Sequence, residues 1–252
     1  MKVFPKINIG LKVLRKRPDG YHDLETLFYP CGTFSDDLEI ERSETFSIDI
    51  DSCDWDPLKD LTVKAYEMLA EEFGLPPVSI RLHKGIPVGA GLGGGSADAA
   101  AALKMLNGMF SLGLDDAALA ARAARLGSDC AFFVYGKPMF GEGRGEILSP
   151  FDLDLGGYEI RVELPEGVRV STKEAYSGVS PCGTSDLRNL LSRPVSDWRG
   201  TVENDFEKSV FAAHPEIAAL KQRFYDEGAV YAAMSGSGSA VFGFFTRCTP
   251  SR

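Results

Sequence analysis

Residues 87–103 read PVGAGLGGGSADAAAAL, a glycine-rich loop that runs directly into an alanine-rich segment with a strong helix preference. The glycines of the loop are Gly89, Gly91, Gly93, Gly94 and Gly95. Glycine leaves the backbone N–H groups uncovered and allows positive φ, so successive amides can converge on one anion. We expect Ser96 to cap a helix from about Ala97 to Met109, with the positive end of its dipole towards the same anion. The stretch therefore predicts a phosphate-binding loop.

Other interpretations of this stretch stay open. A linker or a plain strand-to-helix turn would also be rich in glycine, although a linker rarely continues into so strong a helix. Residues 89–94 match G-x-G-x-x-G, which is typical of dinucleotide-binding folds. Such a loop usually opens the first βαβ unit, whereas more than eighty residues precede this one. The Walker pattern is absent, because no Lys-Ser or Lys-Thr follows the glycines.

Composition narrows the possible classes of function. The chain of 252 residues is long enough for one large domain or two modest ones, and its net charge of −9 argues against a general nucleic-acid binder. Five cysteines stand far apart, which argues against a disulfide framework or a zinc site. They are Cys31, Cys53, Cys130, Cys182 and Cys248. No apolar run approaches the roughly 18 residues of a membrane span, so we expect a soluble cytoplasmic protein.

The amino-terminal segment alternates between apolar and polar side chains over residues 2–14, which predicts a half-buried strand. Lys6 and Asn8 fall on its polar side, about 7 Å apart along the strand. The next segment, RPDGYH at residues 17–22, contains a Pro-Asp-Gly turn, so Tyr21 and His22 follow a tight bend. That pair is suited to stacking on a nucleotide base, and an ordinary turn is the alternative.

Residues 24–126 predict several strands, a helix, a further strand, the glycine-rich loop and two helices, in that order. Strands are expected at residues 24–30, 37–43, 46–51 and 78–84. One helix is expected to be capped by Asp56 and to end at Gly74, and another to run from Asp115 to Leu126. Asp129 follows as a lone acid beside an apolar run, and its position fits a helix cap as well as a functional group.

The pattern changes near Pro150, where we expect a boundary between domains at residues 1–150 and 151–252. Beyond it, strands are expected at residues 158–165 and 168–172, and helices at 202–211 and 215–227. SGSGS at residues 235–239 lies between two β-like runs. It would bring a second set of bare amides together, and a plain hairpin connection is the alternative.

Three stretches taken together resemble the GHMP kinase superfamily. They are FPKINIGLKVL at residues 4–14, the glycine-rich stretch at 87–103, and MSGSGSAVFGFF at 234–245. The resemblance covers almost the whole chain and implies an α+β, two-domain GHMP kinase fold, with an N-terminal βα ATP-binding domain and a C-terminal ferredoxin-like α+β domain. The further segments RPDGYH, GSDCAFF and END are similar to those of ATP-dependent members that phosphorylate the 2-hydroxyl of a cytidine diphosphate alcohol in the non-mevalonate isoprenoid pathway.

The resemblance implies a role for two groups of residues in the transfer itself. Asp129 corresponds to the catalytic base that takes the proton of the substrate hydroxyl, and Lys6 beside it stabilises charge. The ATP phosphates would be held by Gly89, Gly91, Gly93, Gly94, Gly95, Ser96 and Ala97, with Gly236 and Gly238 completing the wall and Lys84 near the adenine. Phosphoryl transfer asks mainly for positioning and for compensation of charge, and these groups offer both.

The same resemblance implies a set of substrate contacts. Asn8, Tyr21 and His22 would bind the cytidine diphosphate alcohol, with the tyrosine stacked on cytosine and the histidine bonded to its polar edge. Tyr176 stands where a second aromatic closes the cytosine sandwich, and Thr172 lies near it. ATP and Mg²⁺ are the implied cofactors, with no metal ligand assigned, and the protein is expected to act as a monomer or a homodimer on a small molecule.

Two features depart from this pattern or complicate it. Cys130 and Ala131 follow Asp129 where the family often has other residues, including a proline, which affects the local backbone. Asp98 is expected in the first turn of the phosphate-binding helix, where it favours the dipole but would repel phosphate unless it faces away or helps to hold Mg²⁺.

Three other functions remain alternatives. A GHMP kinase for a homoserine-like or mevalonate-like substrate would have no need of paired aromatics such as Tyr21 and Tyr176. A nucleotide-binding sensor would use the same loop without catalysis, and the presence of both Lys6 and Asp129 argues against it. A Rossmann dehydrogenase is rejected unless NAD(H) binds.

Overall fold

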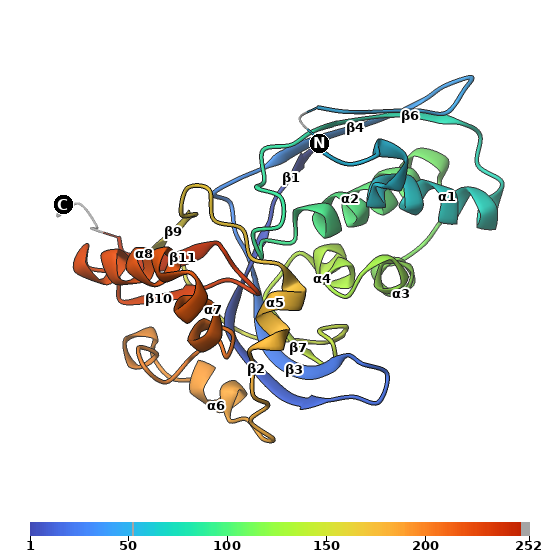
Figure 1. The fold of residues 1–252 in the computed structure, drawn as a ribbon. Helices are drawn as coiled ribbons and strands as arrows, with labels where there is room; N and C mark the ends of the chain where they lie inside the picture. The colour runs from blue at the N-terminus through green and yellow to red at the C-terminus, as the bar shows by residue number, and fades with distance from the viewer. Residues whose placement is uncertain (52, 248–252) are drawn as a thin grey trace, which may run out of the picture. The chain divides into compact units, whose positions relative to one another are not determined.

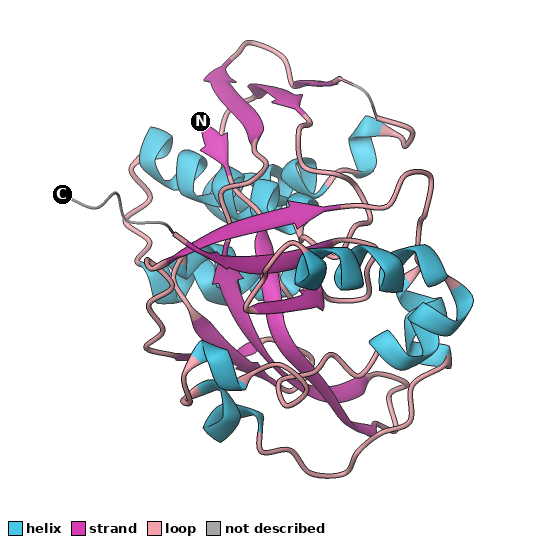
Figure 2. Cartoon of the chain, turned by 90° about the vertical axis from the view of Figure 1, so that its left-hand side faces the viewer, coloured by secondary structure: helices cyan, strands magenta, loops and turns pink. Residues whose placement is uncertain are grey.

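The computed structural model describes residues 1–51 and 53–247 (Figure 1). Helices and strands occur throughout this part of the chain (Figure 2), which confirms the predicted α+β class. Cys248 lies outside the described residues, and the other four cysteines are free thiols. The chain divides into two compact units, and each draws on several separate stretches of sequence.

The first unit comprises Met1–Lys6, Phe34–Val88 and Gly93–Lys137. Its elements are β1 (Lys2–Val3), β4 (Asp36–Arg42), β5 (Ser47–Ile50), the 3₁₀ helix η1 (Pro57–Lys59), α1 (Leu61–Phe73), β6 (Val78–His83), α2 (Gly94–Phe110), α3 (Asp116–Leu126) and α4 (Cys130–Tyr135). The four strands form one sheet in the order β1-β4-β6-β5, in which only β5 and β6 are parallel. Helices α1 and α2 pack together beneath this sheet (Figure 1), where α2 contacts β1 and β4.

Local capping explains the limits of α1. The Asp60 side chain accepts a hydrogen bond from Thr62 N at 2.9 Å and so caps the helix. The predicted cap, Asp56, instead caps the short 3₁₀ turn before it. The predicted end at Gly74 is confirmed, because this glycine adopts a φ of +66°, a left-handed conformation that stops a helix.

The second unit comprises Ile7–Thr33, Gly89–Leu92 and the chain from Pro138 onward. Its elements are β2 (Lys6–Lys16), β3 (His22–Pro30), β7 (Met139–Glu142), β8 (Ile147–Pro150), β9 (Tyr158–Glu163), α5 (Thr172–Ser177), α6 (Leu187–Leu191), η2 (Val195–Asp197), α7 (Glu207–Ala213), α8 (Pro215–Asp226), β10 (Tyr231–Met234) and β11 (Val241–Thr246). Lys6, the first residue of β2, groups with the first unit.

The strands of the second unit form two sheets. One has the order β2-β3-β7-β8, and the other is antiparallel with the order β10-β11-β9. Helix α8 packs on β10 and β11 (Figure 1), and buried side chains such as Phe224, Val241 and Phe245 form the core there. The two units alternate along the chain, and residue 150 lies inside the second unit. The boundary between sequence domains near residue 150 stays a prediction.

Strand β2 differs from the half-buried strand that alternation predicted, because both of its faces are buried. Ile7 and Ile9 are fully covered, and Lys6, Asn8 and Gly10 on the polar side are buried as well. A Cβ on Gly10 would lie 2.5 Å from a methyl carbon of Leu187 in α6, which shows how closely the polar side is covered. The sequence pattern reports the polarity of a face and does not report what packs against it.

The helix after the glycine-rich loop begins earlier than expected. It starts at Gly94, and Gly93 occupies the cap position with a φ of +73° and no side-chain hydrogen bond. The carbonyl of Gly93 accepts from Ala97 N at 2.9 Å, so Ser96 lies inside the helix and is not its cap. The prediction of Ser96 as the cap was wrong, because a glycine in left-handed geometry can turn the chain into a helix without a side chain.

Some of the other predicted helices and strands agree with the structure, and others do not. Helices α3 and α8, and the hairpin of β10 with β11 around residues 235–239, agree with the predictions. The predicted strand at residues 168–172 was wrong, because residues 168–170 form a loop and Thr172 opens α5. The helix predicted at 202–211 begins only at Glu207. Helix α4, within the apolar run after Asp129, was not predicted.

Candidate active site

Lys6 and Asp129 form an ion pair in the first unit. Lys6 Nζ lies 3.3 Å from Asp129 Oδ2, and the lysine side chain is only 3% exposed whereas the aspartate side chain is 31% exposed. Asp129 stands at the position before α4, yet its side chain makes no capping hydrogen bond. The sequence left a cap and a functional group as alternatives; the missing capping bond argues against the first, and the carboxylate is partly exposed to solvent.

The amino end of α2 lies close to this pair. A Cβ on Gly93 would lie 3.2 Å from Lys6 Cε and 3.1 Å from the ring of Phe133, so no larger residue fits there without displacement. Gly94 is equally confined by Ile86. The first N–H groups of a helix have no partner within it and attract anions. The first unit therefore brings together a carboxylate (Asp129), a cation (Lys6) and the N–H groups at the start of α2.

Lys84 lies in the first unit between two carboxylates. Its ammonium group forms ion pairs with Asp36 and with Asp98, the latter at 2.6 Å, and both carboxylates are fully buried. Burial lowers the pKa of Lys84, but the charges and hydrogen bonds of Asp98 and Asp36 outweigh it, so the pKa is raised. Asp98 lies beyond the first turn of α2 and faces Lys84, which corrects its expected position. The adenine contact of Lys84 stays a prediction.

A second glycine-rich wall is built in the second unit. The carbonyl of Gly91 accepts a hydrogen bond from Ser235 Oγ at 2.9 Å, and Ala240 N donates to the carbonyl of Ala90 at 3.1 Å. Gly91 has a φ of +77°, and a Cβ there would lie 2.1 Å from Ser235 O. Gly236 and Gly238 also have positive φ in the same loop. The structure thus packs residues 89–92 against the Gly-Ser loop, while a Cβ on Gly89 would meet nothing within 4 Å.

Asn204, in the END segment, holds the Gly-Ser loop in place. Its Nδ2 donates to the carbonyls of Met234 and Gly236, each at 2.8 Å, and its Oδ1 accepts from Phe206 N at 3.0 Å. The residue is buried, so these three bonds satisfy an amide that burial would otherwise destabilise. The resemblance included the segment END, but it did not indicate that Asn204 holds the Gly-Ser loop.

Asn8 connects β2 to the same loop. Its backbone N–H donates to Ser235 Oγ at 3.2 Å, and its Nδ2 donates to Thr26 Oγ1 at 3.1 Å. A Cβ on Gly236 would lie 3.1 Å from Asn8 Oδ1. The side chain is buried and points towards the Gly-Ser loop, which is compatible with the substrate contact predicted for it.

Two of the aromatic residues predicted to bind the substrate, His22 and Tyr176, stack on each other in the second unit. His22 stacks on Tyr176 with ring centroids 4.7 Å apart and planes 23° apart, and Tyr176 packs edge-on against Phe206 at 4.7 Å. Burial, and then the charge of Lys16, lower the pKa of His22, which favours the neutral imidazole. Thr172 opens α5, four residues before Tyr176, and is exposed.

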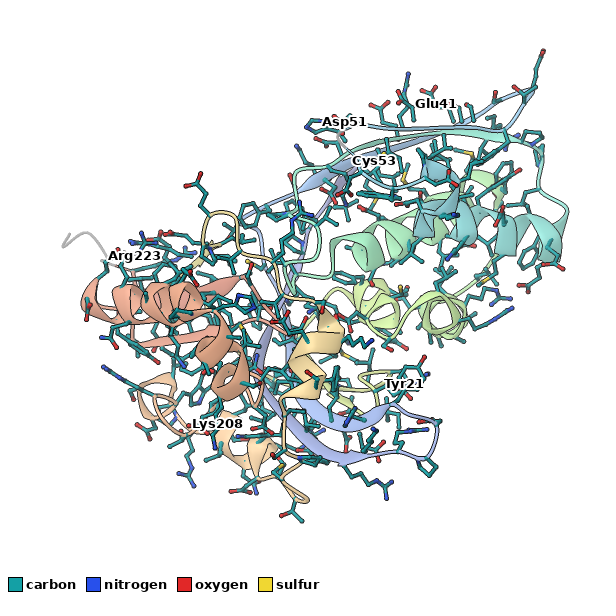
Figure 3. All side chains as sticks on the ribbon, in the orientation of Figure 1. Tyr21, Glu41, Asp51, Cys53, Lys208 and Arg223 are labelled. Carbon is teal, nitrogen blue, oxygen red and sulfur yellow. The ribbon has the colours of Figure 1, made fainter. Side chains whose placement is uncertain are left out.

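Tyr21 lies on the hairpin that joins β2 and β3 (Figure 3) and is 55% exposed. The guanidinium of Arg144 lies over its ring, 4.9 Å from the centroid, in a cation–π contact. Arg144 stands in the glycine-rich turn GEGRGE at residues 141–146, for which the sequence predicted no functional role. Its Nε is buried and makes no hydrogen bond to any described residue.

The structure therefore gathers the predicted residues into two groups, one in each unit. The first unit holds Lys6, Lys84, Gly93, Gly94, Gly95, Ser96, Ala97 and Asp129, and the second holds Asn8, Tyr21, His22, Gly89, Gly91, Thr172, Tyr176, Gly236 and Gly238. Lys6 and Asn8 stand two residues apart in β2, so the chain itself connects the two groups.

Comparison with known proteins decides the family. Residues 60–137 match the GHMP kinases N terminal domain, and residues 187–249 match the GHMP kinases C terminal domain. A protein of Bacteroides fragilis named 4-diphosphocytidyl-2-C-methyl-D-erythritol kinase is 51% identical over 98% of this chain and 92% of its own length. The chain belongs to this family of GHMP kinases.

Another relative and two solved structures are also similar to this chain. The kinase of the same name from Parabacteroides distasonis is 46% identical to this chain over 99% of it and 93% of its own length. A crystal structure of 4-(cytidine 5'-diphospho)-2C-methyl-D-erythritol kinase superposes with a TM-score of 0.79 at 34% identity, covering 96% of this chain and 89% of that one. A homoserine kinase structure from Cytophaga hutchinsonii has a TM-score of 0.72 at 17% identity over 98% and 85% of the chains, a likeness of fold alone.

The part of the chain that the structure describes holds neither a cluster of metal-binding side chains nor a membrane-spanning helix. Over residues 1–51 and 53–247, no three His, Cys, Asp or Glu side chains come together as a metal site. Within the same ranges, every helix is too short or too polar to cross a membrane.

Proposed function

We propose that this GHMP kinase transfers the γ-phosphoryl group of ATP to the 2-hydroxyl of 4-diphosphocytidyl-2-C-methyl-D-erythritol. The observation that carries the proposal is the pairing of Lys6 with Asp129 at 3.3 Å, close to the amino end of α2. The names of relatives as much as 51% identical over nearly the full length supply the substrate.

The transfer step follows from these groups. Asp129 accepts the proton of the substrate hydroxyl while the new O–P bond forms and the bond between the γ-phosphorus and the bridging oxygen of ADP breaks. Lys6 and the free N–H groups at the start of α2 compensate the charge that develops on the phosphoryl oxygens. ADP leaves, and Asp129 then loses its proton to solvent. A positioned base of this kind contributes about 10²–10⁴ in rate.

The residues of the second unit would recognise the cytidine part. A neutral His22 presents one donor and one acceptor to the polar edge of cytosine, and the His22–Tyr176 stack offers an aromatic surface. Tyr21 presents an exposed ring, to which Arg144 adds a positive charge suited to an anionic substrate. Asn8 and Thr172 complete the proposed contacts.

Several finer points belong to the same proposal. Mg²⁺ would arrive with ATP and be held by its phosphate oxygens and by water, as is usual where a protein offers few carboxylates. Gly89, Gly91, Gly93–Gly95, Ser96, Ala97, Gly236 and Gly238 would line the phosphates, and Lys84 would lie near the adenine. We also infer a cytoplasmic location and a monomer or homodimer.

A coupled assay of ADP release tests the proposal. ATP and Mg²⁺ are supplied with 4-diphosphocytidyl-2-C-methyl-D-erythritol, homoserine or mevalonate in parallel. We expect sustained ADP release with the first alone, and competition by CDP. Turnover of homoserine or mevalonate in its place would favour the other kinase specificities. Binding of ATP with no transfer to any of the three would favour a sensor, and both results contradict the proposal.

A further inference from the structure

The cluster of Asp36, Lys84 and Asp98 is buried in the first unit and has no part in the transfer step described above. Its members come from three elements, since Asp36 opens β4, Lys84 follows β6, and Asp98 belongs to α2. The ammonium group of Lys84 pairs with both carboxylates. With both carboxylates ionised, the cluster carries one negative charge in excess.

A buried excess charge is costly, so one of two carboxyls that share one cation is expected to hold a proton. Asp36 Oδ1 accepts hydrogen bonds from Gly85 N and Ile86 N, each at 2.6 Å. Asp98 Oδ1, in contrast, is buried and has no hydrogen-bond partner among the described residues. This difference in hydrogen bonding between the two carboxyl groups assigns the proton to Asp98, from which it can form a hydrogen bond to Asp36. Burial, together with the charge of Asp36 and against that of Lys84, raises the pKa of Asp98 to about 7.

The cluster also lies beside the amino end of α2, the end at which we place the ATP phosphates. A Cβ on Gly94, the first residue of α2, would lie 3.6 Å from Lys84 Nζ and 3.0 Å from Ile86. Asp36 holds the backbone of Gly85 and Ile86, so it fixes this segment against the amino end of α2. An anion bound at that end attracts the charge of Lys84 and repels an ionised Asp98.

We propose that Asp36 and Asp98 are positioning residues of the nucleotide site, which hold Lys84 beside the amino end of α2 and take up a proton when ATP binds. The inference rests on the proposed function, because it needs ATP at that end of the helix. Proton uptake follows because the bound phosphates make the ionised form of Asp98 less favourable.

Other charged groups on the elements around α2 have partners elsewhere or lie at the surface. Asp60, before α1, bonds to Thr62, and Lys2 of β1 pairs with Asp37 of β4. Arg122 of α3 pairs with Glu72, and Asp129, before α4, pairs with Lys6. Other charged side chains of α1 and α3 are exposed, namely Lys64, Glu67, Glu71, Asp115, Asp116 and Arg125. Lys84 and Asp36 are thus the charged groups that act directly on Asp98.

Isothermal titration of ATP into the full chain at pH 7 tests the proposal. Titrations in two buffers with different ionisation enthalpies give the number of protons taken up on binding. Wild type is compared with Asp98→Asn, whose neutral amide imitates the protonated carboxyl, and with Asp37→Asn. The latter is a matched control, because Asp37 follows Asp36 in β4 but pairs with Lys2 at the surface. Protonation of ATP itself is common to all three proteins and cancels in the comparison.

We expect wild type and Asp37→Asn to take up as much as about half a proton more than Asp98→Asn, since a group that titrates near pH 7 is about half protonated there. Equal uptake in wild type and Asp98→Asn, with ATP bound to both, would overturn this inference and leave the proposed function intact. A wild-type chain that binds no ATP would overturn both. If Asp98→Asn does not fold, the affinity of the wild-type protein for ATP is measured from pH 7 to 9. We expect this affinity to fall by up to about tenfold per pH unit. An affinity that does not change with pH would contradict the inference.

Discussion

At the scale of single residues, Asp129 shows what a sequence can and cannot reveal. The motif that contains Asp129 and the motif that contains Lys6 could both be recognised in the sequence, although the two residues stand 123 positions apart. The ion pair between them, and the lack of a capping bond from Asp129, required the structure. The cluster around Lys84 could not be predicted, because Asp36 carries no motif and its hydrogen-bond partners lie in the segment after β6. Tertiary pairing of charges leaves no local pattern in a sequence.

The stack of His22 on Tyr176 predicts a substrate-specific effect. Replacing Tyr176 with Ala removes one aromatic surface for cytosine, and base–aromatic stacking contributes about 1–3 kcal/mol. We expect the KM for the cytidine substrate to rise by about 5- to 100-fold, with little change in the KM for ATP. Tyr176→Phe is the control and should restore the affinity, since it keeps the ring. Steady-state kinetics with each substrate varied in turn checks this, and an equal rise in both KM values would contradict it.

Asp98 predicts a pH dependence of stability at the same scale. Its pKa is raised in the folded state from 3.8 to about 7, so between these values the native protein binds more protons than the unfolded chain. The free energy of unfolding contributed by this group is therefore present at low pH and is lost as pH rises towards 7. Asp98→Asn should flatten that part of the profile, measured by urea unfolding between pH 5 and 8. A slope unchanged by the substitution would contradict the assignment.

At the scale of elements, the loops and helix starts were the hardest features to predict. The sequence indicated that a glycine loop runs into a helix, and α2 confirms it, yet the helix begins at Gly94 because Gly93 takes the left-handed conformation. The segment at residues 168–172 has the β-branched composition of a strand, but it has no partner strand. Val170 is buried in the core of the second unit instead, so packing outweighed propensity.

The glycine-rich wall predicts a difference between two glycines of similar conformation. Gly89 and Gly91 have φ values of +71° and +77°, but only Gly91 faces a backbone oxygen, 2.1 Å from the position of a Cβ. Gly89→Ala should cost about 1–2 kcal/mol of unfolding free energy from the left-handed backbone alone. Gly91→Ala should cost a further 1–3 kcal/mol or so, because the loop must move away from Ser235. Denaturant unfolding of both variants checks this, and equal losses would rule out the close contact as the cause.

At the scale of the whole molecule, the family and the α+β class were predicted from three motifs spread along the chain. Such motifs can be recognised because a loop that brings successive backbone amides together needs glycine at particular positions. The arrangement of two interleaved units could not be read from them, since residues 89–92 belong to one unit and Gly93 begins the next stretch of the other. Likewise, the burial of both faces of β2 depends on α6 and on other segments far along the chain.

The central claim is that Asp129 acts as the base in phosphoryl transfer to the cytidine diphosphate alcohol. The most direct test measures turnover and ATP affinity together in wild type and in Asp129→Asn. We expect kcat to fall by about 10²–10⁴-fold, while the Kd for ATP changes by less than about threefold, because the amide keeps the shape but cannot accept the proton. Turnover close to that of wild type in Asp129→Asn, with ATP bound equally well, would contradict it.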